Sequence, residues 1–159
     1  MDLSSHTWQN VRTMTAPIIS RALRKFLNPL SSIYYELIHS SAVWFKVAEA
    51  GRVGTSDVWG DTPLMSPGNA YTFTVPSCLA AGSYIVRNEI IALHTAGEYP
   101  GVQFYPSCFQ IAVTGSGTST GPTTKVSFPG AYAPTDPGIT YDMYIAQTYT
   151  IPGPTLFTC

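Results

Sequence analysis

The sequence predicts an all-β fold, and three features of the chain indicate it. Thirteen glycines and thirteen prolines punctuate the 159 residues, and both residue types favour tight turns. Ten tyrosines are present, and tyrosine is enriched in β-strands. Short stretches rich in β-branched and aromatic residues lie between the turn residues, at the spacing of a β-sandwich. Because 45% of the residues are hydrophobic and only 11% are charged, we expect a packed core rather than disorder.

The expected strands follow one another from residue 43 onwards. Val43–Val47 is a short strand, and Tyr71–Val75 alternates aromatic or apolar residues with threonine. Ser83–Leu93 is the strongest strand signal in the chain. Cys108–Thr114 is the next expected strand, and Lys125–Phe128 is a further short candidate. The proline- and glycine-rich tail that follows is expected to wrap the surface.

Alternation within the longest expected strand assigns its side chains to two faces. A period of two places the even-numbered residues from Tyr84 to His94 on one face and the odd-numbered residues from Ile85 to Leu93 on the other. Arg87 and Glu89 share the second face, so we expect them to form a local charge pair.

Residues 1–42 differ in character from the rest of the chain. They hold four of the eight basic residues and the only helix-like stretch, residues 18–27, which the stop signal Asn28-Pro29 follows. No basic and then apolar stretch follows Met1, so a secretory signal is not expected here. We interpret residues 1–42 as a separate, partly helical or disordered segment that arises from a gene-model artefact, with an organelle transit peptide as the alternative. Residues 43–159 form the β domain.

Charge and cysteine content exclude several classes of protein. The net charge of −1 gives no field that would attract nucleic acid or an anionic membrane, and no apolar run is long enough for a transmembrane helix. Few charges and many tyrosines suit a neutral, hydroxyl-rich partner such as a polysaccharide. Cys78, Cys108 and Cys159 form no C-x-x-C pair, which argues against a zinc ribbon. Their odd number leaves one thiol without a partner in this chain.

One group of polar residues could carry chemistry. His94 closes the longest expected strand, and Gln103 and Tyr105 follow a loop that returns towards it. Gln103 and Tyr105 are two residues apart and point the same way on an extended chain. An imidazole, a carboxamide and a phenol can therefore converge at one surface. On spacing alone, the alternative is a hydrogen-bonded trio that only closes the end of the sandwich.

Several segments resemble the fungal lytic polysaccharide monooxygenases of auxiliary activity family nine, formerly glycoside hydrolase family sixty-one. The strand that ends Ala92-Leu93-His94, followed by Gln103 and Tyr105, is specific to that family. The resemblance covers about residues 42 to 159. Its other segments are 43–47, 71–78, 84–91, 106–108, 113–117, 129–132, 136–139 and 149–154.

The resemblance implies an immunoglobulin- or fibronectin-III-like β-sandwich with long loops, here truncated at its N-terminal strands. It also implies a secreted, extracellular, monomeric copper enzyme that uses an external electron donor and dioxygen or hydrogen peroxide to hydroxylate C1 or C4 of cellulose or related β-glucans. Tyr105 matches the family's axial copper ligand. His94 and Gln103 match the pair that hydrogen-bonds the reactive oxygen species. Tyr144 matches a tyrosine on the cellulose-facing surface.

The same resemblance implies two departures from the family. Two histidines brace the copper upstream of the Trp44-Phe45-Lys46 segment in the family, but neither His6 nor His39 stands in a matching motif. We therefore expect the histidine brace to be absent and copper to be held weakly. The family's partner for Cys108 lies near the start of the domain. Cys108 is thus expected to be unpaired, with Cys78 and Cys159 as the disulfide.

Three functions compete on these grounds. The first is the family's copper-dependent oxidation. The second is an inactive, copper-free carbohydrate-binding or interaction protein on the same sandwich. The third is a glycoside hydrolase, which needs two carboxylates at a defined separation, and only Glu89 and Glu98 are candidates near His94. Hydrolysis is the least expected of the three.

Overall fold

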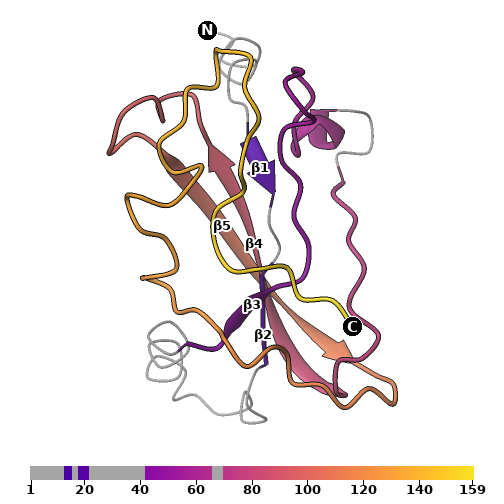
Figure 1. Cartoon of the computed structure of the whole chain (residues 1–159). Coiled ribbons are helices and arrows are strands. Elements are labelled where there is room, and N and C mark those ends of the chain that lie inside the picture. Colours follow the sequence, from indigo (N-terminus) through magenta and orange to yellow (C-terminus); the bar gives the residue numbers. More distant parts are fainter. Residues whose placement is uncertain (1–12, 16–17, 22–41, 66–69) are drawn as a thin grey trace, which may run out of the picture.

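The computed structural model describes residues 13–15, 18–21, 42–65 and 70–159. Five strands within these ranges form one antiparallel sheet (Figure 1). A single 3-10 helix, η1, is described beside these strands. The strands are β1 (Thr13–Thr15), β2 (Ile18–Arg21), β3 (Trp44–Lys46), β4 (Gly82–Ala92) and β5 (Gln103–Val113), and η1 spans Thr62–Met65.

β4 is the centre of the sheet. β5 pairs with it along its whole length, from Gly82 opposite Val113 to Ala92 opposite Gln103. The other edge of β4 is shared by β1 and β2, and β2 also pairs with β3. β1 and β2 keep one register on β4, because residue 15 faces residue 90 and residue 18 faces residue 87. The two short strands therefore lie in line along one edge.

The N-terminal strands change two expectations. Residues 13–15 and 18–21 pair with β4, so the sheet extends into the segment that composition sets apart at residue 42. Ile18–Arg21 is a strand, so the helix expected over residues 18–27 is wrong for its first turn. Pairing with both β3 and β4 outweighs a weak helix propensity there, and two successive isoleucines favour a strand. Residues 1–12 and 22–41, including His6 and His39, lie outside the described part of the chain.

Later strands agree in part with the expectations. β3 and β4 confirm the strands expected at Val43–Val47 and Ser83–Leu93. Tyr71–Val75 is not a strand, because it packs Phe73 and Val75 on a core cluster and does not join the sheet. β5 begins at Gln103 rather than Cys108, since the hairpin with β4 continues past Pro106. Residues 125–128 form only one bridge, from Val126 to Trp44.

Hydrophobic clusters cover different halves of β4 on its two faces. Tyr84 and Val86 pack with Phe45 and Leu79 on one face. Ile91 and Leu93 lie on the opposite face, by the alternation of the strand, and pack with Trp59, Ala96, Tyr141 and Met143. The tail from residue 129 onwards supplies part of this second cluster and forms no strand among the described residues, as expected (Figure 1).

A buried charge pair lies in the middle of β4. Arg87 Nη2 donates to Glu89 Oε1 at 2.6 Å, which confirms the expected pair. The second oxygen of Glu89 accepts the Tyr132 hydroxyl at 2.6 Å. The Arg87 guanidinium also lies 4.0 Å from the ring centroid of Phe128. Because Glu89 is fully buried, these contacts replace the water that its carboxylate would otherwise bind.

One disulfide joins the tail to the chain before β4. Cys78 and Cys159 are bonded with their Cα atoms 5.7 Å apart, and Cys108 is free and exposed on β5. This is the pairing that the family resemblance implies. Within the described ranges, no helix has both the length and the apolar character that crossing a membrane requires.

Candidate functional site

Gln103 and Tyr105 meet at the start of β5. The Tyr105 hydroxyl donates a hydrogen bond to Gln103 Oε1 at 2.7 Å, and both side chains are exposed. They lie two residues apart on a regular strand, so they share one face of the sheet. The contact predicted from their spacing is therefore present.

His94 lies at the same end of the hairpin. Ala92 pairs with Gln103 and Ile90 with Tyr105, and His94 follows the last paired residue by two positions, in the turn that leaves β4. No hydrogen bond joins its imidazole to Gln103 or Tyr105. Its Nδ1 atom is buried and makes no hydrogen bond with any described residue. The site thus contains a hydrogen-bonded amide and phenol, and an imidazole with an unsatisfied Nδ1 atom lies at the same end of the hairpin.

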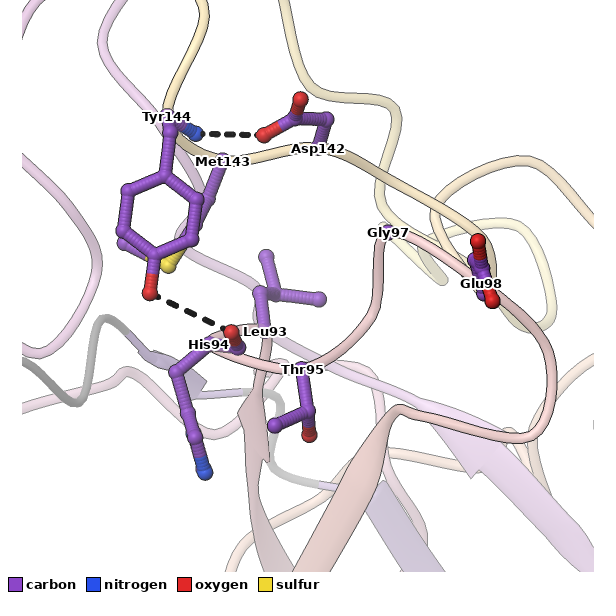
Figure 2. A pocket seen from close by; sticks show the side chains of 8 residues that line it. All are labelled: Leu93, His94, Thr95, Gly97, Glu98, Asp142, Met143 and Tyr144. Atoms are coloured by element: carbon purple, nitrogen blue, oxygen red, sulfur yellow. Dashed lines mark hydrogen bonds between the residues drawn. The ribbon is translucent and has the colours of Figure 1, made fainter.

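Tyr144 approaches this site from the tail. Its hydroxyl donates to the backbone carbonyl of His94 at 3.2 Å, and 72% of its surface is exposed. The imidazole of His94 points away from this contact (Figure 2). The Tyr141 amide donates to the Ala96 carbonyl at 2.7 Å, so two hydrogen bonds to backbone carbonyls hold the tail against the turn that follows β4.

A hollow of about 400 Å³ opens between the same two segments (Figure 2). The Glu98 and Asp142 carboxylates line it, and the spacing pattern did not single out Asp142. Its position follows from the tail contacts, which a strand-by-strand analysis does not capture. The lining residues are Leu93, His94, Thr95, Gly97, Glu98, Asp142, Met143 and Tyr144.

The described residues do not by themselves fit a copper ion. No group of three or more histidine, cysteine, aspartate or glutamate side chains gathers within the described part of the chain. His94 is the only one of the chain's three histidines that lies there. Copper sites rely on several nitrogen or sulfur ligands, and this site offers one imidazole beside an amide and a phenol.

The geometry also excludes Glu89 as a hydrolytic carboxylate and Ser119 as a nucleophile. Both oxygens of Glu89 are engaged by Arg87 and Tyr132 in a buried setting, so it cannot reach a glycosidic bond. Residues 117–121 carry the letters of the G-x-S-x-G pattern, which invites a serine-hydrolase reading. Ser119 instead lies in a bridge with Leu79, and its hydroxyl accepts the Gly121 amide at 3.2 Å. The strand–turn–helix that a nucleophile elbow requires is absent at these residues.

Two buried tyrosines predict a loss of stability at alkaline pH. Burial raises the pKa of Tyr132, and the nearby Glu89 carboxylate raises it further. Burial also raises the pKa of Tyr149, with a smaller contribution from Tyr141. The unfolded phenols ionise near pH 10, so their stabilisation is complete below about pH 10 and falls by up to about 1.4 kcal/mol per pH unit for each tyrosine above it.

The slope is obtained by measuring the free energy of unfolding at several pH values between neutral pH and about pH 11. Tyr149→Phe should give a shallower alkaline slope than the unchanged chain. An identical slope would show that Tyr149 does not contribute to it.

A protein-family model shows to which family the chain belongs. The model of auxiliary activity family 9, formerly glycoside hydrolase family 61, matches residues 23–150. The chain belongs to auxiliary activity family 9. The match begins upstream of residue 43, where the change in composition places the start of the β domain.

Curated relatives agree with this family. The chain is 68% identical over 120 residues to an auxiliary activity family 9 lytic polysaccharide monooxygenase F of Botryotinia fuckeliana. The aligned region covers 76% of this chain and 48% of the relative. It is 52% identical over 129 residues to a lytic polysaccharide monooxygenase A of Gloeophyllum trabeum, covering 78% of this chain and 39% of the relative. The chain thus spans about half the length of these relatives or less.

Solved structures confirm the fold class. Cel61B of Hypocrea jecorina, a glycoside hydrolase family 61 member, superimposes with a TM-score of 0.75 at 32% identity, over 96% of this chain and 64% of that one. HiLPMO9B gives a TM-score of 0.76 at 35% identity, over 96% of this chain and 66% of that one. The family 9 chain described here therefore has the all-β, immunoglobulin-like sandwich fold expected from its sequence.

Proposed function

We propose that this chain provides the glucan-facing, hydrogen-bonding part of a copper-dependent site for oxidative cleavage of cellulose or related β-1,4-glucans. The observation that carries the proposal is the Tyr105–Gln103 hydrogen bond at the same end of the hairpin as His94. In this assignment the Tyr105 phenol would be a ligand of the copper, and His94 and Gln103 would offer hydrogen-bonding groups to the oxidant. Membership of the monooxygenase family supports it. Tyr144 supplies an exposed aromatic surface for a sugar ring.

The chemistry of the described residues limits how copper is held. A bound copper ion would supply the redox step with dioxygen or peroxide and an external electron donor. One imidazole and one phenol among the described residues are too few ligands for tight binding. Because neither His6 nor His39 stands in a motif of the family, we propose that this chain lacks the histidine brace. Extracellular action on an insoluble, uncharged polymer fits a monomer with few charges and a disulfide.

A second candidate is a copper-free protein that binds glucan without oxidising it. The lack of any group of three metal-ligating side chains in the described ranges favours it. Both candidates predict retention on insoluble cellulose. They differ in whether protein-dependent oxidised products appear when copper and a reductant are added.

The test combines copper titration with product analysis. We expect weak copper binding and, at copper concentrations that saturate it, C1- or C4-oxidised oligosaccharides that require the reductant. His94→Ala should lower their yield about 100-fold, since positioned proton donors contribute at least this much, while retention on cellulose stays unchanged. Retention without such products at any copper concentration would select the second candidate.

Tight, stoichiometric copper binding would contradict the missing brace. His6→Ala and His39→Ala are the matched controls for that outcome. If either substitution abolished tight binding, histidines outside the described residues would complete the site.

A further inference from the structure

Arg52 links two loops beside the site, although no sequence motif singles it out. Its Nη1 atom donates to the Tyr141 hydroxyl at 2.9 Å, the Ile145 carbonyl at 2.8 Å and the Gln147 carbonyl at 3.2 Å. Its Nε atom donates to the Ser56 carbonyl at 2.8 Å. One guanidinium therefore joins its own loop to the tail segment 141–147.

An aromatic ring fixes the direction of this guanidinium. The Arg52 Cζ atom lies 4.9 Å from the ring centroid of Trp59, which is buried. Cations favour the face of a tryptophan ring. A planar fork with several donors reaches separate acceptors in a way that the single ammonium of lysine does not reproduce. The Arg52 guanidinium is thus restrained by the Trp59 ring and by its hydrogen-bond acceptors, unlike a charge that only solvent surrounds.

The segment that Arg52 holds carries Tyr144. Within segment 141–147, the Tyr144 amide donates to Asp142 Oδ1 at 2.9 Å, and Gln147 Nε2 donates to the Asp142 carbonyl at 2.8 Å. The Tyr141 hydroxyl donates to the Gln147 carbonyl at 2.8 Å. Because Tyr144 is largely exposed, packing contributes little to its position. Its place beside His94 depends on the hydrogen bonds of the segment, on Arg52 and on the burial of Tyr141 and Met143 in the same segment.

We propose that Arg52 is a positioning residue that holds segment 141–147 so that Tyr144 stays beside His94 on the glucan-facing surface. The nature of the ligand rests on the proposed function, whereas the restraint on the segment rests only on the contacts above. A substitution at Arg52 should therefore weaken glucan binding while the sheet stays folded.

The test compares Arg52→Met, which keeps an unbranched apolar stem over Trp59, with Lys125→Met as a matched loss of one cation outside this segment. Two quantities are measured: hydrogen exchange of the amides in residues 141–147, and the affinity for insoluble cellulose. We expect exchange to accelerate and affinity to fall about tenfold, the loss that corresponds to one charged hydrogen bond. Arg52→Lys should recover part of both, and Lys125→Met should change neither.

The two measurements separate the possible failures. Unchanged exchange and unchanged affinity in a folded Arg52→Met chain would overturn the inference. If the unchanged chain does not bind cellulose, the proposed function fails, and the exchange rates still decide the role of Arg52. If Arg52→Met unfolds, the exchange of residues 141–147 is measured in Arg52→Lys. Faster exchange in that variant supports the inference, and unchanged exchange overturns it.

Discussion

Replacing Glu89 with alanine is expected to destabilise the fold by about 3–5 kcal/mol, the usual effect of removing one partner from a buried ion pair. Glu89 is fully buried and accepts hydrogen bonds from Arg87 and Tyr132. Without it, the Arg87 guanidinium keeps its charge in the interior and has lost its carboxylate partner. Urea unfolding at neutral pH measures the change in free energy.

Two controls make this expectation specific. Glu98→Ala removes an exposed carboxylate and should change the free energy by no more than about 0.5 kcal/mol. The double variant Arg87→Met with Glu89→Leu removes both charges and should recover much of the lost stability, because an apolar pair of similar volume can replace a buried ion pair. A loss below about 1 kcal/mol for Glu89→Ala would mean that water or a rearranged side chain replaces the pair.

Removing the disulfide is the second large expected effect. Cys78 and Cys159 are 81 residues apart in sequence, and closing a loop of that length contributes about 4 kcal/mol in the loop-entropy description. The double variant Cys78→Ser with Cys159→Ser should lose about this free energy of unfolding. Cys108→Ser leaves the bridge intact and is the matched control. Equal stability of the two variants would contradict a structural role for the bridge.

Thiol labelling of the native chain gives an independent check on the same pairing. Cys108 is exposed and should be the cysteine that reacts before reduction. Its reaction at neutral pH should be slower than that of a free thiol, because partial burial raises the pKa of Cys108, with Glu89 adding to the rise and Arg87 opposing it. Labelling at Cys78 before reduction would contradict the assigned bridge.

Alternation and turn residues were enough to predict the centre of the sheet. The pattern from Ser83 to Leu93 predicts β4, its two faces and the Arg87–Glu89 pair, all of which the structure confirms. These features follow from short-range periodicity, which the sequence contains directly. The contact between Gln103 and Tyr105 is predictable for the same reason, because side chains two residues apart on a strand point to the same side of the sheet.

Features set by distant contacts were not predictable in this way. Ile18–Arg21 becomes a strand because β3 and β4 lie on either side of it, and residues 71–75 do not join the sheet although their alternation suits a strand. The hollow beside His94 and the anchoring of segment 141–147 by Arg52 depend on where the tail crosses the sheet. Long-range packing of irregular segments leaves no periodic signal, so spacing alone cannot reveal it.

The most direct test of the account is the yield of oxidised oligosaccharides from cellulose, measured by mass spectrometry with copper in excess and a reductant present. The account predicts reductant-dependent products from the unchanged chain and about 100-fold less from Gln103→Leu, the usual effect of removing one preorganised hydrogen-bond donor, with cellulose retention equal in both. Equal yields from the two proteins would contradict a working site at the end of the β4–β5 hairpin.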